Sequence, residues 1–210
     1  MIKKLRKRVR KNYFLNSIYY ILTYYKTNPK INFNKIDKVL FIAHPDDEII
    51  FFSKELIYKS GWLVVCMTNG GNWVRQKEFI SAMNTIGAQY KIFNYKDGFK
   101  VKWNEKNITY KIKSIIQCRD KWSMVATHNN LGEYGHFQHK ELNRIVSKIY
   151  TDDGIYMPSL KEDSISDENR LPIEHYKIKE DIIVNIYKSQ SIMKCFKRFI
   201  EHEGIEKKYN

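Results

Sequence analysis

Short apolar runs alternate with longer segments of helical periodicity along most of this chain, starting at Lys38. The apolar runs predict strands at Val39–Ala43, Leu63–Met67, Tyr90–Tyr95, Trp122–Thr127 and Gly154–Met157. The periodic segments predict helices at Asp47–Tyr58, Arg75–Ile86, Ile108–Cys118, His136–Tyr150 and 178–200. Strands that alternate with connecting helices predict an α/β fold with a Rossmann-like, mostly parallel sheet and helices on both faces.

The segment before these elements has a different pattern. Apolar side chains recur there at helical spacing, so residues 1–27 predict one or two amphipathic helices. Residues 28–36, which include Asn28-Pro29, predict a linker. We therefore expect a basic N-terminal segment with its linker at 1–36 and an α/β domain at 37–210.

Charge separates the same two regions. The 210 residues carry a formal charge of +14, and nine Lys or Arg side chains but no acidic ones lie in residues 1–30. The other 28 basic and 23 acidic side chains leave residues 31–210 with only +5. The excess charge is typical of a segment that contacts an anionic membrane surface or a nucleic acid. A solvated extension is the simplest alternative for this segment.

Cysteine content and apolar run length indicate the compartment. Cys66, Cys118 and Cys195 lie far apart and form no CxxC pair, which argues against a disulfide framework and a cysteine zinc site. The sequence has no run of 18 uncharged apolar residues, so no membrane-spanning helix is predicted. The basic start followed by an apolar run resembles a signal peptide only weakly, because no small-x-small cleavage site follows it. We therefore expect a cytoplasmic protein.

Two clusters of candidate chemistry follow predicted strands. His44-Pro45-Asp46-Asp47-Glu48 comes after the first strand, and Gly132-Glu133-Tyr134-Gly135-His136-Phe137-Gln138-His139 comes after the fourth. Ligands bind beyond the carboxyl ends of the strands in open α/β sheets, so both clusters should open on one edge. Imidazole and carboxylate groups suit Zn²⁺, and a catalytic zinc takes three protein ligands and keeps one open position. A His and an Asp from the first cluster with a His from the second would supply such a set.

These motifs together resemble the PIG-L / LmbE-like family of zinc-dependent N-acetylglucosamine deacetylases. The HPDDE run is the most specific part of the resemblance, which covers roughly Lys38 to Gln190. Supporting elements are the following: Thr68-Asn69-Gly70-Gly71 with Arg75, Glu78, Ala82 and Ile86-Gly87; Asp97-Gly98; Lys188-Ser189-Gln190. The resemblance implies an LmbE-like deacetylase domain that binds one Zn²⁺ per chain, although iron is an alternative to zinc in the cell.

The resemblance also implies a role for each matching position. The implied zinc ligands are His44, Asp47 and His139. Asp46 is implied as the general base, His136 as the electrostatic or acid partner, and Tyr134 as a group that polarises the carbonyl oxygen or helps product release. The implied substrate contacts are Arg75, for an anionic aglycone, and Asp97, for sugar hydroxyls. Glu48 is expected to be structural, since an acid in a first helical turn suits the helix dipole.

The chain departs from the family pattern at two places. Phe137-Gln138 stand where many relatives have Pro-Asp, so residue 138 supplies no carboxylate to orient a neighbouring histidine. Phe51 and Phe52 stand in a stretch that is often glycine-rich, and we expect them to pack in the core rather than at the mouth of the site. The role of His128 stays open.

The resulting hypothesis is a zinc-dependent hydrolase that removes the N-acetyl group from an N-acetyl-hexosamine. The substrate would be a small-molecule or lipid-linked acetylated amino sugar in glycan or cell-surface polysaccharide metabolism. Residues 1–27 would contact an anionic inner membrane surface peripherally, and no nucleic acid partner is expected. One alternative is a zinc amidase that acts on another amide or a thiol conjugate. A lesser alternative is a basic membrane- or nucleic-acid-binding protein with a degenerate enzyme domain.

Overall fold

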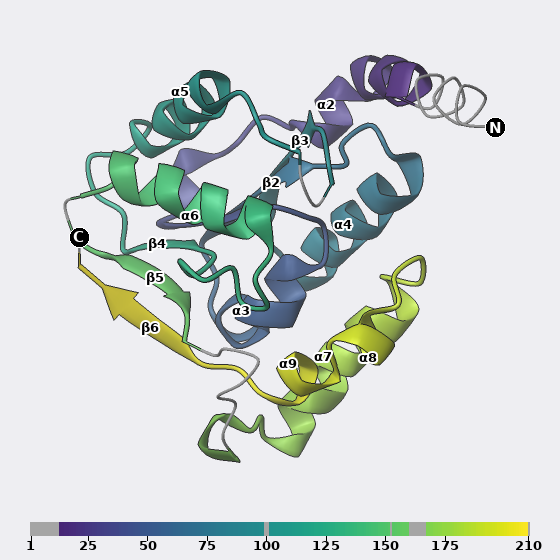
Figure 1. The fold of residues 1–210 in the computed structure, drawn as a ribbon, viewed down its shortest axis with the longest axis vertical. Helices are drawn as coiled ribbons and strands as arrows, with labels where there is room; N and C mark the ends of the chain where they lie inside the picture. The colour runs from purple at the N-terminus through teal and green to yellow at the C-terminus, as the bar shows by residue number, and fades with distance from the viewer. Residues whose placement is uncertain (1–12, 99–100, 152, 160–166, 210) are drawn as a thin grey trace.

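A six-stranded sheet forms the centre of the molecule, with helices on both sides (Figure 1). The computed structural model describes residues 13–98, 101–151, 153–159 and 167–209. The strands are β1 (Lys38–Ile42), β2 (Trp62–Thr68), β3 (Gln89–Tyr95), β4 (Met124–Thr127), β5 (Ile155–Pro158) and β6 (Ile205–Lys208), in the spatial order β3-β2-β1-β4-β5-β6. The first five are parallel, and β6 runs antiparallel to β5. The expected Rossmann-like, mostly parallel sheet is confirmed.

Two hydrophobic clusters cover the two faces of the sheet. One cluster packs under α3 (Asp47–Tyr58), α4 (Trp73–Ile86), α7 (Ile173–Asn185), α8 (Ile192–Cys195) and α9 (Lys197–Glu201). The other packs under α5 (Glu105–Ile116) and α6 (Phe137–Ile149). Alternate residues of β1 enter opposite clusters, because successive side chains of a strand point to opposite faces. A central parallel strand buried on both sides therefore reads as an unbroken apolar run.

The C-terminal part differs from the sequence prediction. The helix expected over 178–200 was wrong: α7 begins at Ile173, after Pro172, and a loop separates it from the short α8 and α9. The loop contains Ser189 and Gln190, whose polar groups bond to α4 rather than continuing a helix. Strand β6 was not predicted, because Glu206, Lys207 and Lys208 give an edge strand no apolar signal.

An N-terminal helix over residues 13–22, followed by α2 (Tyr24–Thr27), packs beside the loop after β2. Buried Gln76 of α4 donates hydrogen bonds to Thr23 Oγ1 at 2.9 Å and to Gly70 O at 2.6 Å, which joins the two parts. The approach requires a glycine, since a Cβ at Gly70 would lie 2.8 Å from the ring of Tyr20. The earlier part of the helix expected over 1–27 lies outside the described residues. In the described part of the chain, no helix is long and apolar enough to span a membrane.

The connections reverse direction between β1 and β4. From β1 the chain proceeds to β2 and β3 on one side and then crosses to β4 and β5 on the other. The loops after β1 and β4 therefore separate at this switch point and leave a crevice at the carboxyl ends of the strands. Both sequence clusters lie in these two loops, as expected.

Candidate active site

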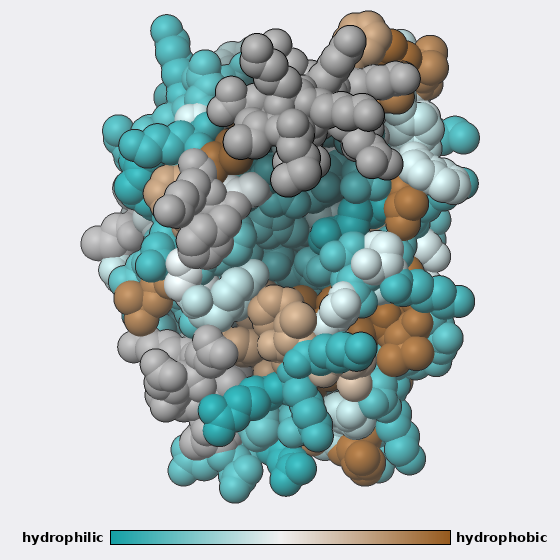
Figure 2. Space-filling view, turned by 45° about the vertical axis from the view of Figure 1, so that its right-hand side comes forward, coloured by the Kyte–Doolittle hydropathy of each residue, from teal (hydrophilic) through white to brown (hydrophobic). Residues whose placement is uncertain are grey.

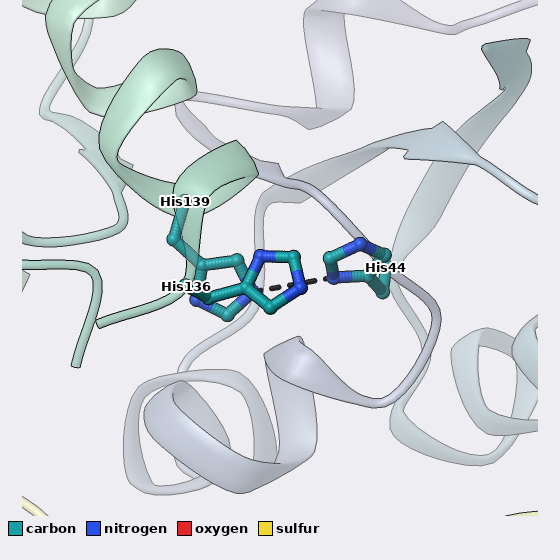
Figure 3. Close-up of side chains that lie close together, drawn as sticks. All are labelled: His44, His136 and His139. Carbon is teal, nitrogen blue, oxygen red and sulfur yellow. Dashed lines mark hydrogen bonds between the residues drawn. The ribbon is translucent and has the colours of Figure 1, made fainter. Parts of the chain in front are cut away.

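Three predicted ligands converge in the crevice between the loops after β1 and β4. His44 follows β1, Asp47 begins α3, and His139 lies in the first turn of α6. Figure 3 shows His136 and His139 extending from α6 toward His44, which comes from the opposite loop. His44 Nδ1 lies 3.2 Å from His139 Nε2 and 3.3 Å from Asp47 Oδ2, and His139 Nε2 lies 3.4 Å from Asp47 Oδ2.

These spacings fit a single small metal ion. Tetrahedral geometry with bonds of about 2.0–2.1 Å places neighbouring ligand atoms about 3.3–3.4 Å apart. The three atoms named above form a triangle with sides of that length. Two imidazole nitrogens and a carboxylate oxygen are also ligand types that zinc accepts. His44, Asp47 and His139 are therefore suited to hold one metal ion.

Outer hydrogen bonds orient both histidines. His139 Nδ1 lies 2.6 Å from Glu133 Oε2, so this nitrogen donates to the carboxylate and Nε2 faces the site as an acceptor. His44 Nε2 lies 2.9 Å from Gln138 Oε1 and donates to it, which leaves Nδ1 facing the site. Partners of this kind fix the tautomer of a metal-ligating histidine. The carboxylate that position 138 lacks is thus supplied by Glu133, five residues earlier.

His128 is a positioning residue rather than an additional ligand. Its ring stacks on His139 with centroids 3.7 Å apart, and its Nε2 lies 3.3 Å from Asp47 Oδ2. Asp47, His128 and His139 therefore form a second possible ligand group by distance. However, His128 Nε2 already accepts a hydrogen bond from Ala43 N at 3.0 Å, while its Nδ1 faces Glu133. Since the lone pair of His128 Nε2 accepts from the Ala43 backbone, it is not available to a metal, and the ring packs against His139.

Charges in the crevice favour a cation. Burial acts to raise the pKa of Asp47, but the neighbouring His139 and His128 hold it well below the usual range. Burial likewise opposes the charge of Glu133, yet His128 and His139 lower its pKa to about 2. Burial would lower the pKa of His44, but Asp47 and Asp97 raise it to about 10. The carboxylates thus stay ionised and attract positive charge to the histidines, whether a proton or a metal ion.

Asp46 has a strained backbone beside the metal ligands. Its φ is 108° and its ψ is −30°, a conformation that non-glycine residues rarely adopt. Glu48 Oε2 accepts a hydrogen bond from Asp46 N at 3.1 Å, and Tyr187 donates its hydroxyl proton to Glu48 Oε1. Glu48 is fully buried, and burial raises its pKa to about 8, so it differs from the ionised first-turn acid that was expected to suit the helix dipole. Strain held by surrounding contacts is common at functional sites. Here the two adjacent aspartates have different neighbours, since Asp47 lies beside His44 and His139 whereas Asp46 lies beside Arg75.

Arg75 joins the first loop to the C-terminal part. It donates to Pro45 O and, at 2.8 Å, to Gln190 Oε1, and it lies 3.3 Å from Asp46 Oδ2. One turn later on α4, Glu78 accepts two hydrogen bonds of 2.7 Å from the backbone N and hydroxyl of Ser189. The Arg75 and Glu78 side chains of α4 therefore bind the Ser189–Gln190 segment, which is distant in sequence. Both terminal nitrogens of Arg75 thus donate to protein groups, while its buried Nε has no hydrogen-bond partner among the described residues.

His136 and Tyr134 form the opposite wall of the cavity. The cavity has a volume of about 180 Å³ and is lined by His44, Asp46, Asp47, Ile50, Arg75, Asp97, Tyr134, His136 and Phe196. His136 caps α6, because its Nδ1 accepts from Gln138 N at 3.3 Å, so the neutral ring carries its proton on Nε2. Burial and the nearby His139 and His44 lower the pKa of His136 to about 4. Burial also raises the pKa of Tyr134, which keeps its hydroxyl a donor.

The structure brings all eight predicted site residues to one crevice. Asp97 was expected to contact sugar hydroxyls, and in the structure it also contacts protein groups. Its Oδ1 lies 3.3 Å from His44 Nε2, and its Oδ2 accepts from Asn69 at 3.0 Å. Glu133 and Gln138 were not predicted as site residues. The signal for Glu133 was present, because a carboxylate in the same loop as the histidines can reach them. Phe51 is buried and packs edge-on against the rings of His128 and His139, as expected for a core residue.

Sequence comparison finds known proteins that resemble this chain. The family model described as PIG-L, GlcNAc-PI de-N-acetylase, matches residues 39–150. The uncharacterized protein L374 of Acanthamoeba polyphaga mimivirus is 36% identical over 188 residues, which cover 81% of this chain and 79% of that protein. A probable N-acetylglucosaminyl-phosphatidylinositol de-N-acetylase of Schizosaccharomyces pombe is 29% identical over 124 residues, covering 50% of this chain and 48% of the relative. The chain thus matches about half the length of that named relative.

Solved structures share the fold at low sequence identity. The N,N'-diacetylchitobiose deacetylase from Pyrococcus horikoshii superposes with a TM-score of 0.62 at 16% identity, covering 96% of this chain and 92% of that one. A deacetylase of the teicoplanin biosynthesis pathway gives a TM-score of 0.57 at 15% identity, covering 77% of this chain and 89% of that one. At this level of identity the likeness establishes the fold.

Proposed function

The chain belongs to the PIG-L family of de-N-acetylases, and on this premise we propose that it is a zinc-dependent hydrolase that removes the N-acetyl group from an N-acetyl-hexosamine sugar or glycoconjugate. The observation that carries the proposal is the triangle of His44 Nδ1, Asp47 Oδ2 and His139 Nε2, with sides of 3.2–3.4 Å. The relatives named as N-acetylglucosaminyl-phosphatidylinositol de-N-acetylases support a substrate of the N-acetylglucosamine type.

His44, Asp47 and His139 would hold the metal. When bound there, Zn²⁺ would act as a Lewis acid toward the amide carbonyl and increase the acidity of water. The protein would hold the ligands ready, since Glu133 and Gln138 fix the ring orientations of His139 and His44. This arrangement lowers the cost of organising the site at the moment of binding.

Asp46 is proposed as the general base. Burial is the main cause that raises its pKa, which is about 7, and a base is most effective when its pKa lies near the working pH. The carboxylate lines the cavity and neighbours Asp47 in sequence, but it is not part of the ligand triangle. It would accept a proton from the attacking water and pass it to the nitrogen that leaves as the free amine.

His136 and Tyr134 are proposed to stabilise the charge that develops on the carbonyl oxygen. Attack on an amide carbon produces an oxyanion, and donors already in place lower the energy of that state. The neutral ring of His136 offers its Nε2 proton, because its Nδ1 is committed to the cap of α6. The Tyr134 hydroxyl lines the same cavity and stays protonated. Acetate and the free amino sugar would be the products.

A test of the proposal measures metal content and acetate release with the same protein samples. We expect one zinc per chain and acetate release from N-acetylglucosamine derivatives, presented free, UDP-linked and lipid-linked. The Asp46→Asn variant is expected to keep its zinc and to lose at least 100-fold in kcat, the scale of general-base catalysis. Undiminished activity of that variant would refute the role of Asp46. Release of acetate only from other amides or thiol conjugates would favour the amidase alternative.

We also propose that the enzyme works in the cytoplasm, with the N-terminal segment against an anionic inner membrane surface. Phe14, Ile21, Leu22 and Tyr25 are between 66% and 88% exposed, and helical spacing places Phe14, Ile21 and Tyr25 on one side. The lysines and arginines of residues 1–30 supply matching positive charge. A helix with apolar side chains and a basic flank is suited to lie in the lipid interface.

Sedimentation with vesicles tests the membrane proposal. We expect binding to vesicles that contain anionic lipid, little binding to neutral vesicles, and weaker binding as salt increases. The Ile21→Glu/Leu22→Glu variant should lose this binding, whereas Tyr110→Glu, which alters an exposed aromatic of α5, should not. Equal binding of both variants would refute the contact. Preference for an oligonucleotide at matched salt would favour a nucleic-acid role instead.

A further inference from the structure

Two apolar side chains belong to the otherwise polar lining of the 180 Å³ cavity at the ligand triangle. Of the nine described residues that line it, seven carry polar or charged groups, whereas Ile50 and Phe196 present only hydrocarbon. The proposed mechanism uses polar groups and leaves these two side chains without a role. Figure 2 shows a hydrophilic hollow on one face of the molecule, with apolar side chains gathered along its lower edge.

Phe196 reaches the cavity from the C-terminal part of the chain. It lies outside residues 39–150, where the family model matches, and it separates α8 from α9 with a non-helical φ of −126°. Its backbone N donates to Ile192 O at 2.8 Å, and its backbone O accepts from Ile200 N at 3.1 Å. Its ring packs on the ring of Tyr134, with centroids 4.9 Å apart. The Phe196 ring is therefore held at the cavity wall beside a proposed catalytic group.

Buried neighbours on both sides anchor the segment that carries Phe196. Ile192, before it, is 1% exposed, and Phe199, after it, is 3% exposed. The Phe199 ring packs edge-on against Phe51 with centroids 5.4 Å apart, and Phe51 packs against the ring of His139. Because side chains in a packed interior have few alternative positions, the wall formed by Phe196 resists displacement by a ligand.

Ile50 forms a second fixed part of the wall, on α3. Its side chain is 2% exposed, and its carbonyl oxygen accepts from the fully buried ammonium group of Lys179 at 2.7 Å. The helical backbone is interrupted two residues later, at Phe52, where φ is −133°. Since both its side chain and its carbonyl group are held, Ile50 has little freedom to move aside.

The three substituents of the reacting amide carbon require three different surroundings. The carbonyl oxygen is assigned to His136 and Tyr134 in the proposed mechanism, and the nitrogen carries the sugar, which has to extend toward the opening of the cavity. The acyl chain is the third substituent, and burial of hydrocarbon is favourable against apolar surface. Ile50 and Phe196 provide the purely apolar surface of this cavity. The acyl chain is thus matched to these two residues by elimination and by polarity.

We propose that Phe196, together with Ile50, forms the end wall of an acyl pocket and restricts the enzyme to short acyl groups. The inference rests on the proposed function and adds the residue that limits the length of the acyl chain. At about 180 Å³, the cavity is smaller than the 300–1,000 Å³ typical of small-molecule sites. A longer acyl chain would therefore have to displace a packed side chain, which overpacks the site.

The test compares acyl chains of increasing length on one sugar. The substrates are the methyl glycosides of N-acetyl-, N-propanoyl- and N-butanoylglucosamine, and the assay measures the free amine that all three release. In the full-length enzyme, kcat/KM should be at least about 100-fold higher for the acetyl than for the butanoyl compound, because one methylene in a closed apolar pocket changes this ratio about 10- to 200-fold. Phe196→Ala should reduce the ratio to within tenfold, and Phe196→Leu should give an intermediate ratio.

A matched control and a second reading separate specificity from simple packing. Met193→Ala truncates a partly buried side chain of α8 that does not line the cavity, and it should keep the wild-type ratio. Thermal unfolding identifies which variants are folded, and Phe196→Leu is the milder change if the alanine variant is not. A folded Phe196 variant that loses kcat equally on all three substrates would show that the ring only supports Tyr134, and it would overturn the inference.

Binding measurements distinguish failure of this inference from failure of the proposed function. Titration calorimetry with the Asp46→Asn protein should give at least tenfold tighter binding of the acetyl than of the butanoyl compound, and adding Phe196→Ala should reduce this difference to within threefold. Amine release by the wild-type enzyme without preference for acetyl would overturn this inference but not the proposed function. If no amine is released from any of the sugars, the proposed function fails, and equal affinities in the titration would overturn this inference as well.

Discussion

Replacing Glu133 by glutamine tests whether this buried carboxylate prepares the site for its metal. Glu133 accepts three hydrogen bonds: from His139 Nδ1 at 2.6 Å, from His128 Nδ1 at 3.2 Å and from Asn129 N at 2.8 Å. The two carboxylate oxygens share these donors, because Oε2 faces both rings and Oε1 faces the backbone. A glutamine has nearly the same shape, yet only one of its two terminal atoms can accept.

The size of the effect follows from this arrangement. Whichever way the amide turns, its NH₂ group faces a donor, either the ring N–H groups or the backbone N–H of Asn129. The negative charge that increases the basicity of His139 Nε2 is lost as well. Loss of such an outer partner commonly costs 10–100-fold in metal affinity, which corresponds to about 1.4–2.8 kcal/mol. We therefore expect the zinc Kd to increase by this factor and acetate release at limiting zinc to fall in parallel.

Competition with a chromophoric chelator measures the zinc affinity of the wild-type and Glu133→Gln proteins. Glu174→Gln, which alters an exposed carboxylate of α7, is the matched control and should keep the wild-type affinity. Glu133→Asp should recover part of the loss, because it restores the charge. A Glu133→Gln protein that is folded but binds zinc within twofold of wild type would refute the orienting role of Glu133.

Three further predictions concern other parts of the molecule. Chelation of the metal should abolish acetate release and lower the thermal unfolding temperature, since a ligand that binds only the folded state stabilises it. Added zinc should restore both the activity and the unfolding temperature. Activity that survives complete metal removal would exclude a metal-dependent reaction. His136→Asn removes the imidazole donor, so kcat should fall about 100- to 1,000-fold. The asparagine keeps an acceptor at the cap of α6, so the unfolding temperature should change little. His136→Ala should lose a further ~1 kcal/mol of stability, and wild-type kcat in the asparagine variant would remove His136 from the mechanism. Lys179→Met should reduce the free energy of unfolding by about 3–5 kcal/mol, measured by urea denaturation, because fully buried Lys179 donates to Ile50 O, Phe199 O and Glu203; a loss below 1 kcal/mol would contradict this.

The sequence alone determined the alternation of elements and most of the site. The helix predicted at Asp47–Tyr58 has the same bounds as α3, and five of the strands, β1 to β5, were recognised from apolar runs. These features depend on local periodicity and on burial of the sheet from both sides, which the chain expresses directly. The two clusters that contain His44, Asp47 and His139 could be placed together because parallel strands end at a common edge. The choice of these three residues as ligands came from the resemblance to the family.

Only the tertiary structure decided which groups serve the ligands. Glu133 orients His139, and Gln138 orients His44. Glu133 can reach His139 because the loop after β4 turns at Glu133, where φ is 53°. The predicted helix over 178–200 failed for a similar reason, because the polar groups of Ser189 and Gln190 bond to Glu78 and Arg75 of α4. The Ser189–Glu78 and Gln190–Arg75 pairs join residues more than 100 positions apart, so no local sequence pattern predicts them.

The N-terminal helix shows the same division. The amphipathic period of residues 1–27 and the positive charge of residues 1–30 were readable from the sequence, and they are the basis for proposing an anionic partner. The position of the N-terminal helix beside the loop of Gly70 and Gly71 came only from packing. There Asn16 and Ser17 line a groove that shares Asp97 with the cavity at the ligand triangle. Helical periodicity reports that one face of a helix is apolar, but the partner of the other face is chosen by side chains elsewhere in the chain.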